Sequence, residues 1–206
     1  MPLVNALSTI QKQRRDEIIL AAISSLAENG YVATSFAEIG RRVGLSKSVV
    51  AYHFTSKEAL IDAVVNAIYD KGFTVVRPAM DEAATAQGKI DAFIKRSIYF
   101  YQEYREYVVA LGSLRVHLSS KGTPNTTAVS RLHKELTDIG IILHEGQIRG
   151  EFRDFSVPIM ARTLRQALDG VLIEMTHHPG LDTDEYTKEL TQLFEKTLRK
   201  EENDER

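Results

Sequence analysis

The sequence contains no cysteine among its 206 residues. This absence excludes a disulfide framework, a thiolate zinc site and a cysteine nucleophile. Glycine and proline are few, at 12 and 5, and they are scattered, which excludes collagen-like and low-complexity chains. Instead, 43% of the residues are hydrophobic and 26% are charged, the composition of a chain with a real core.

Long apolar runs are also lacking. No uninterrupted run approaches the roughly 20 residues that a membrane-spanning helix needs. Residues 1–10 are mildly apolar, but no basic residues precede them and a polar segment follows at once, so we expect no signal peptide. We therefore expect a cytoplasmic protein with no membrane partner.

Neither sign of charge dominates, since the net charge is -2. Residues 1–60 hold seven Lys and Arg against five Asp and Glu, whereas the rest of the chain holds 19 against 23. This asymmetry is weak evidence by itself, so the functional interpretation depends on motifs.

Hydrophobic residues recur at the helical period, and no stretch alternates convincingly with period two, which predicts an all-α fold. The first apolar stripe covers residues 18–26 and stops at Asn29-Gly30. A fourth helix, capped by Ser56, begins at residue 57 and fades towards Gly72 or Pro78. Further helices are expected over residues 89–104, 106–119, 125–149, 156–177 and 182–200.

Between these lie two short helices with local start and stop signals. Ser35 and Glu38 fit a capping box, in which the serine oxygen accepts a helix amide and the glutamate returns to the serine amide. Gly44 suits the left-handed position that ends this helix. Ser46 can cap the next helix, which runs through residue 54.

Three short helices with a glycine-containing turn between the second and third make a helix-turn-helix unit. Its interior is expected to contain Phe36, Ile39, Val43, Leu45, Val50 and Phe54. Its third helix is expected to present Lys47, Ser48, Val49, Ala51 and Tyr52 to a major groove. The amides at the helix N-termini capped by Ser35 and Ser46 can bind phosphate oxygens. By spacing alone, however, such a helix pair is also common in proteins that never touch DNA.

A more specific pattern covers three segments: GYVATSFAEIG at residues 30–40, VGLSK at residues 43–47 and YHFxSKEAL at residues 52–60. The pattern resembles the N-terminal signature of TetR-family regulators, nearly without gaps over residues 14–65. The resemblance implies a three-helix DNA-binding domain over residues 1–56 and a larger helical ligand-sensing and dimerisation domain over residues 57–206. The implied partners are double-stranded operator DNA, a small-molecule effector and a second copy of the chain.

The same resemblance implies roles for individual residues. Phosphate contacts are implied for Thr34, Ser35, Tyr52 and Lys57, and base reading for Lys47, Ser48 and Val49. Many members of the family have an aromatic residue where this chain has Ala51, so the operator sequence does not carry over.

Neighbouring residues have several interpretations. His53 lies beside the expected core and is interpreted as a packing residue with some phosphate contact. Arg41 and Arg42 are interpreted as favourable charges at a helix C-terminus. Arg14 and Arg15 are expected to precede the first helix, either contacting phosphate or forming a solvated tip.

The C-terminal helices show features of a dimer interface. One apolar stripe at helical spacing consists of Tyr186, Leu190, Leu193, Phe194 and Leu198. Gly170 allows close helix approach. By resemblance, the last two helices pack against their copies as a four-helix interface, and the alternative is that the stripe buries against its own chain.

Five aromatic residues fall within residues 99–107. Tyrosines suit a pocket for an amphipathic or aromatic ligand, although an ordinary core explains most of them equally well. The resemblance implies a ligand pocket in this region, and its predicted lining is Phe93, Tyr104, Leu114 and His117.

An enzyme is the competing class. Glu174-x-x-His177 has the spacing of a di-iron bundle, but the required second copy is missing, so we interpret His177 as a helix cap. His133 and His144 are separated by about 16 Å along one helix, too far for one metal. No nucleophile elbow, phosphate loop or dinucleotide fingerprint is present. We expect no catalysis, no metal and no cofactor; the remaining alternative is a helical protein-interaction bundle that does not bind DNA.

Overall fold

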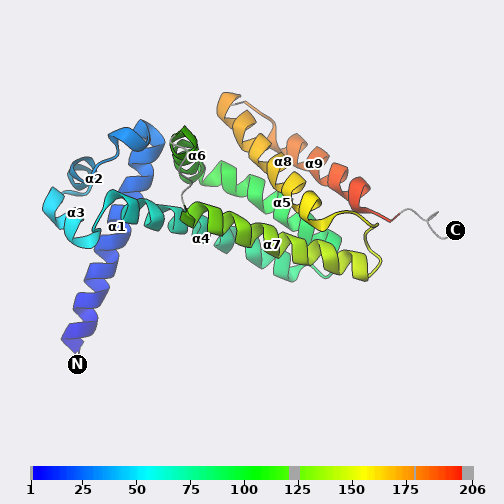
Figure 1. Cartoon of the computed structure of the whole chain (residues 1–206), viewed down its shortest axis with the longest axis horizontal. Coiled ribbons are helices and arrows are strands. Elements are labelled where there is room, and N and C mark those ends of the chain that lie inside the picture. The colour runs from blue at the N-terminus through cyan, green and yellow to red at the C-terminus, as the bar shows by residue number, and fades with distance from the viewer. Residues whose placement is uncertain (1, 121–125, 179, 201–206) are drawn as a thin grey trace. The chain divides into compact units, whose positions relative to one another are not determined.

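The computed structural model describes residues 2–120, 126–178 and 180–200, which are mostly helical (Figure 1). In these ranges the helices are α1 (Pro2–Ala33), α2 (Phe36–Val43), α3 (Lys47–His53), α4 (Lys57–Glu82), α5 (Ala86–Glu103), α6 (Arg105–Ser120), α7 (Thr126–Ile148), α8 (Val157–His177) and α9 (Thr183–Leu198). The same residues contain no strand beyond an isolated bridge between Phe152 and Arg199. The predicted all-α fold is confirmed.

The chain forms two compact units. Unit 1 consists of Met1–Asp70 and Tyr104–Val129, and unit 2 of Lys71–Glu103 and Ser130–Arg206. The predicted functional division at residue 56 remains a prediction, and α4 begins directly after it at Lys57.

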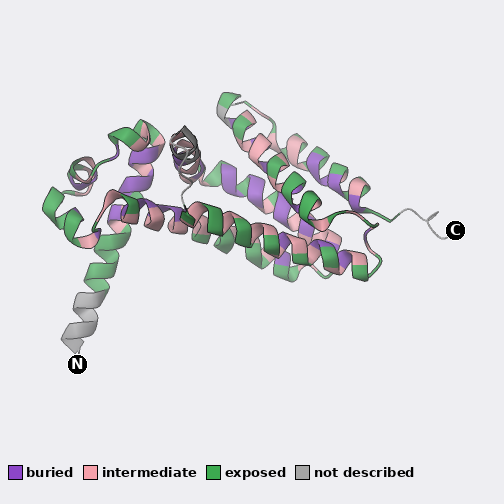
Figure 2. Cartoon of the chain, in the orientation of Figure 1, coloured by how far each residue is buried: buried purple, intermediate pink, exposed green. Residues whose placement is uncertain are grey.

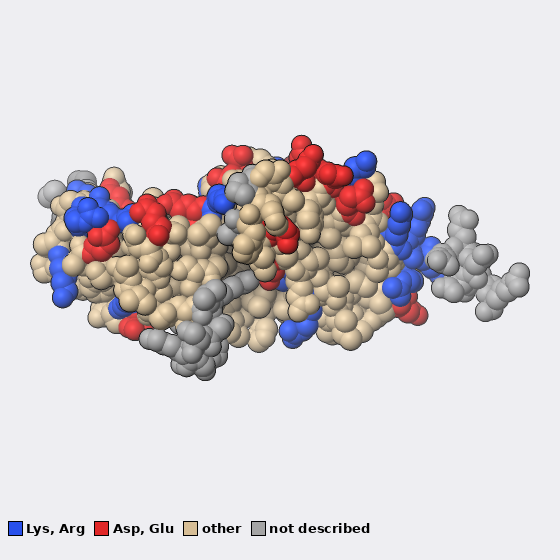
Figure 3. Space-filling view, turned by 90° about the horizontal axis from the view of Figure 1, so that it is seen from above, with Lys and Arg blue, Asp and Glu red and all other residues tan. Residues whose placement is uncertain are grey.

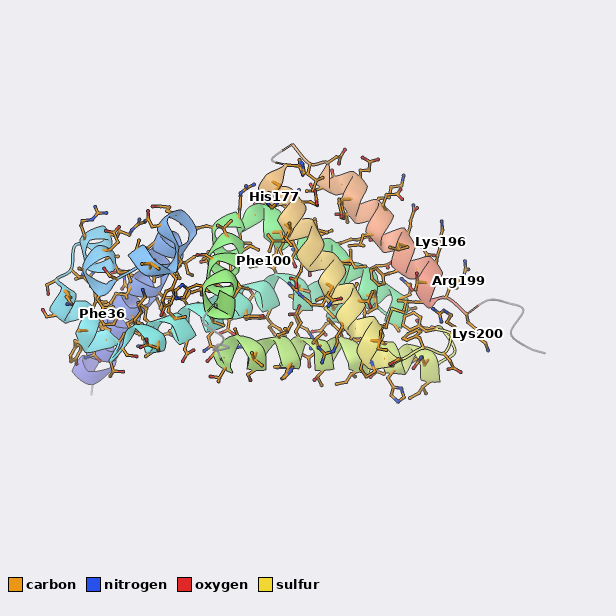
Figure 4. The ribbon with its side chains drawn as sticks, turned by 45° about the horizontal axis from the view of Figure 1, so that its top comes forward. Phe36, Phe100, His177, Lys196, Arg199 and Lys200 are labelled. Carbon is orange, nitrogen blue, oxygen red and sulfur yellow. The ribbon has the colours of Figure 1, made fainter. Side chains whose placement is uncertain are left out.

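The core of unit 1 brings α2 and α3 against α1, the first part of α4 and α6. Ile39, Val50 and Phe54 are fully buried, as the pattern predicted for the helix-turn-helix interior. The other predicted members are partly buried against this core: Phe36, Val43 and Leu45. Figure 4 labels Phe36 on α2, and Figure 2 shows the buried residues on the inner faces of these helices. The apolar residues therefore hold α3 with one face inward and the other outward.

Unit 2 is built on α5, which packs against α8 and α9. Buried residues recur along α5 from Ala86 to Tyr101, including Phe100, which Figure 4 labels. The loop after α7 closes this packing, because a Glu151 carboxylate oxygen accepts hydrogen bonds from the amides of Ala86 (2.8 Å) and Gln87 (3.3 Å). The first amides of a helix have no partner within the helix, so Glu151 caps α5 from a loop that is far away in sequence.

Helix α4 continues where the sequence predicted that it would fade. Gly72 and Pro78 both lie inside it, and it ends only at Glu82. Proline has no amide to donate and weakens the helix around it. Here Arg96 of α5 donates to the carbonyl of Val75 (3.3 Å), so a tertiary contact holds the helix just before Pro78.

Helix α1 begins much earlier than expected. Because it starts at Pro2, Arg14 and Arg15 lie within the helix and not ahead of it. The predicted stop at Asn29-Gly30 corresponds to a kink at Gly30, whose φ is 74°. Over the part of the chain that the structure describes, none of the helices has both the length and the apolar character to cross a bilayer.

Candidate nucleic-acid interface

The start of α2 follows half of the predicted capping box. The Ser35 hydroxyl accepts the amide of Glu38 at 3.2 Å. The Glu38 carboxylate instead accepts from Arg41 (2.9 and 3.0 Å) and from Arg42 (2.8 Å). The serine cap is therefore confirmed, whereas the Glu38 carboxylate pairs with the two arginines at the C-terminal end of the same helix.

The turn between α2 and α3 is built on two glycines. Gly44 ends α2 in the left-handed region, with φ 68°, as predicted. The amide of Leu45 then donates to the carbonyl of Gly40 at 2.8 Å. A Cβ placed on Gly40 would lie 2.5 Å from the Leu45 carbonyl oxygen, so this close approach requires glycine. The turn sets the direction in which α3 leaves α2.

Helix α3 has two different faces. Its start is capped by Ser46, whose hydroxyl accepts the amide of Val49 at 3.3 Å and lies 2.8 Å from the Ser48 hydroxyl. Val50 is fully buried, whereas Tyr52 is 73% exposed. The predicted contact residues on this helix are exposed together: Ser46, Lys47, Ser48, Val49 and Tyr52. The exposed face combines a positive charge, hydroxyl groups and small side chains.

Thr34 lies inside unit 1 and not on this surface. Its side chain is 1% exposed. The hydroxyl donates to the Gly30 carbonyl (2.9 Å) and is 3.0 Å from the Ser25 hydroxyl. The predicted phosphate contact by this side chain is therefore replaced by a structural role: Thr34 holds the chain at the entrance to α2.

Lys57 and His53 are both half-buried. The Lys57 ammonium donates to the Tyr31 carbonyl at 2.5 Å and lies 3.9 Å from the centre of the Tyr31 ring. The His53 carbonyl accepts from Arg15 at 2.8 Å. Contacts with α1 therefore hold both residues in place. These contacts also fix the positions from which the two residues would bind a phosphate group.

Arg15 and Arg42 connect α1 to the rest of the helix-turn-helix. Arg15 also lies over the Phe54 ring, 4.0 Å from its centre. Arg42 binds Glu28 of α1 at 2.7 Å in addition to Glu38. Spacing within a helix predicted neither contact, because each joins residues that are far apart in sequence.

These ion pairs shift the carboxyl groups. The hydrogen bond from Arg42 lowers the pKa of Glu28. Hydrogen bonds from Arg41 and then Arg42 lower the pKa of Glu38. Both carboxylates are thus held ionised, and they neutralise part of the positive charge at the end of α2. The lone positive charge of Lys47, by contrast, stands on the exposed face of α3.

The four predicted effector-lining residues do not fall in one unit. Phe93 is buried in unit 2, whereas Tyr104, Leu114 and His117 belong to unit 1. Leu114 is part of the unit 1 core, and the His117 ring stacks on Tyr31 at 4.0 Å. Leu114 and His117 therefore pack within unit 1, on the side of α6 that faces α1.

Both α8 and α9 carry exposed apolar residues. On α8, helical spacing puts Ile159, Ile173 and Gly170 on one side; the two isoleucines are 67% and 55% exposed, and a Cβ on Gly170 would meet nothing within 4 Å. On α9, Leu193 is 58% exposed. The remaining aliphatic and phenyl members of the predicted stripe are buried within unit 2: Leu190, Phe194 and Leu198.

The histidine motif at the end of α8 acts locally. His177, labelled in Figure 4, has Nδ1 2.9 Å from the Ile173 carbonyl, consistent with a helix cap. Glu174 pairs with His178, not His177, at 2.9 Å. Within the described ranges no three His, Asp or Glu residues are grouped to hold a metal ion.

Comparison with known proteins places this geometry in context. Residues 18–64 match the family model of bacterial regulatory proteins of the tetR family. The transcriptional repressor KstR2 of Mycolicibacterium smegmatis is 27% identical over 154 residues, covering 74% of each chain.

Solved structures agree on the fold. A protein described as a TetR-family transcriptional regulator from Rhodococcus sp. superposes with a TM-score of 0.81 at 18% identity, covering 90% of this chain and 98% of its own. A transcriptional regulator from Saccharomonospora viridis, solved in complex with choline, superposes with a TM-score of 0.79 at 20% identity, covering 92% and 100%.

Proposed function

The chain belongs to the TetR family of bacterial regulatory proteins, and we propose that it is a ligand-responsive transcriptional repressor. In this proposal it binds a palindromic operator in the cytoplasm as a homodimer. A small amphipathic or aromatic effector releases it from the DNA.

The observation that carries the proposal is the exposed face of α3. Lys47, Ser48 and Val49 stand at its N-terminal end, where a recognition helix meets base edges. Val50 and Phe54 on the opposite side are buried in the core, so these contacts orient the helix. We assign base reading to these three residues.

Phosphate contacts are assigned around this helix. The hydroxyls of Ser35 and Ser46 cap α2 and α3, and the amides beside them are suited to phosphate oxygens. Tyr52 offers an exposed hydroxyl, and His53 and Lys57 flank it. Such contacts orient a protein on DNA without reading its sequence.

A second copy of the chain supplies the other half-site. Ile173, Leu193 and Gly170 offer an apolar face with room for a close helix. The charges of α9 are also self-complementary for a two-fold axis. Its first turn carries Asp184 and Glu185. Lys196, Arg199 and Lys200 stand at the other end, where Figure 3 shows basic side chains gathered on unit 2. In an antiparallel pair, each acidic end meets a basic end.

Release follows from a two-state equilibrium. Half-sites one helical turn apart require recognition helices about 34 Å apart. We propose that an effector bound among the helices of unit 2 shifts α4 and changes this separation. Effector and operator then weaken each other's binding by the same factor.

The experiment that tests the function is selection of bound duplexes from a random DNA pool, using ligand-free full-length protein at moderate salt. A recovered palindrome with half-sites about one turn apart, or a multiple, supports the homodimeric regulator. Failure to enrich any sequence, with and without candidate effectors, contradicts DNA binding and favours a helical interaction bundle.

A further inference from the structure

The start of α1 extends beyond the core of unit 1. Residues 9–16, which we call the α1 extension, are all exposed, and the first of the described residues that is buried is Ile18. Figure 2 shows this exposed stretch ahead of the buried part of the helix. The match to the family model begins at the same Ile18, so the α1 extension lies outside it. Helix propagation by itself contributes little stability, so contacts with other groups matter for this stretch.

Two side chains of the α1 extension reach α3. The Gln11 amide donates to the Tyr52 hydroxyl at 3.5 Å, and Arg15 donates to the His53 carbonyl at 2.8 Å. Arg15 also lies over the Phe54 ring. Gln11 and Arg15 are four residues apart and therefore share one face of α1. This face lies against the C-terminal end of α3, within the same compact unit.

The α1 extension is basic. It carries Lys12, Arg14 and Arg15 against a single acid, Asp16. Arg14 pairs with Glu17 at 2.6 Å, and Arg15 is held by α3. Lys12 forms no ion pair with any residue that the structure describes. Its charge is therefore available to an anion from outside the chain.

The position of Lys12 indicates which anion this is. At 3.6 residues per turn, Lys12 lies about 60° around α1 from Arg15, so it flanks the face that meets α3. Tyr52, which that face contacts, is 73% exposed and is assigned to a phosphate of the operator. A lysine beside Tyr52 faces the same DNA backbone, and its long side chain delivers a point charge that suits a phosphate.

Gln11 adds a directional effect on Tyr52. An amide nitrogen only donates, so the tyrosine oxygen is the acceptor in this contact. The hydroxyl hydrogen of Tyr52 then points elsewhere and can be donated to a phosphate oxygen. Gln11 is thus a positioning residue for the phosphate contact of Tyr52.

We propose that the α1 extension is a second DNA-binding element of unit 1, in which Lys12 binds an operator phosphate and Gln11 orients the Tyr52 hydroxyl. This inference rests on the proposed binding of operator DNA. It adds backbone contacts beside the groove that α3 enters and leaves base reading to α3.

Ethylation interference tests the contact of Lys12. The operator recovered by selection is ethylated at random phosphates, and full-length wild type is compared with Lys12→Gln and with Lys188→Gln, which alters an exposed lysine of α9. Ethylation of one phosphate in each half-site should weaken wild type and Lys188→Gln but not Lys12→Gln. For Lys12→Gln, the slope of log affinity against log salt should shrink by about 0.9 for each half-site, with the selected motif unchanged. An unchanged interference pattern or salt slope, or an altered motif, would overturn this contact.

A double-mutant cycle tests the positioning role of Gln11. Gln11→Ala should weaken operator binding about 2- to 10-fold in the wild-type background, the effect of one hydrogen bond. In the Tyr52→Phe background it should have no effect, because the hydroxyl is already missing. Gln13→Ala is the matched control, since Gln13 contacts Glu17 of its own helix at 3.4 Å, and it should change neither background. An equal loss from Gln11→Ala in both backgrounds, or none in wild type, would refute the positioning role.

Selection from random DNA separates this inference from the proposed function. If no sequence is enriched, the proposed function fails and the α1 extension has no operator to bind. If an operator is recovered but Lys12→Gln and Gln11→Ala bind it as wild type does, the function stands and this inference fails.

Discussion

Gly40 and Lys47 have different roles in the helix-turn-helix. Gly40 contributes the absence of a side chain, which lets the Leu45 carbonyl approach α2. Lys47 contributes an exposed charge at the start of α3. Gly40 determines the path of the backbone, and Lys47 determines the charge that α3 exposes.

Replacing Gly40 with alanine should destabilise the protein by about 1–3 kcal/mol, because the new Cβ meets backbone and not a movable side chain. Urea unfolding measures the change. Gly112→Ala on α6 is the matched control, since nothing lies within 4 Å of its added Cβ. It should be neutral or stabilising by up to about 1 kcal/mol. Equal stability of the Gly40→Ala variant and wild type would contradict the close approach.

Replacing Lys47 with alanine should weaken operator binding by about 1–3 kcal/mol and relax sequence preference at one position of each half-site. Selection from a random duplex pool measures both effects. Lys188→Ala on α9 removes the same charge from an exposed position in unit 2 and should change neither. A weaker binder with an unchanged selected motif would reassign Lys47 to a phosphate.

At the scale of the element, α2 is held at its C-terminal end by the ionic contacts of Arg42 and by the glycine turn that follows. Arg42 joins it to α1 through Glu28 and to its own first turn through Glu38. Arg42 and Glu38 are 18% and 23% exposed and Glu28 is 58% exposed, so solvent still screens these pairs and each contributes modestly by itself. Their effect is to keep α2 in register with α1.

The ion pairs of Arg42 with Glu28 and Glu38 predict that stability depends on pH. Since the pKa values of Glu28 and Glu38 are lowered in the folded protein, their contribution is present above the unfolded pKa and is lost as pH falls through the folded one. The melting-temperature difference between wild type and the double variant Glu28→Gln, Glu38→Gln should therefore be present at pH 7 and vanish in strong acid. Glu189→Gln on α9 serves as control. A melting-temperature difference that grows in acid would refute a stabilising role for these ion pairs.

At the scale of the whole molecule, the exposed apolar face of α8 and α9 predicts association. The double variant Ile173→Glu, Leu193→Glu should raise the dimer Kd by more than about 100-fold, because burying uncompensated carboxylates costs several kcal/mol. Light scattering measures the solution mass. Val32→Glu, at a position of unit 1 that is 81% exposed, should leave the mass unchanged. A double variant that keeps the wild-type mass would exclude this face.

The predictable part of the fold was local. Helical periodicity indicated every helix that follows the DNA-binding region, and Ser35, Ser46 and Gly44 marked real boundaries. Each of these signals acts through residues within one turn, so it does not depend on the rest of the chain. The exposed face of α3 was also predictable, because its buried partners recur at helical spacing.

The sequence by itself therefore determined the all-α class, the helix-turn-helix and the exposed side of its third helix. Only tertiary structure decided that Thr34 is buried, that α4 passes through Pro78 and that the aromatic run after residue 98 divides between two units. These outcomes depend on contacts between distant segments, whose free energies local propensity does not contain.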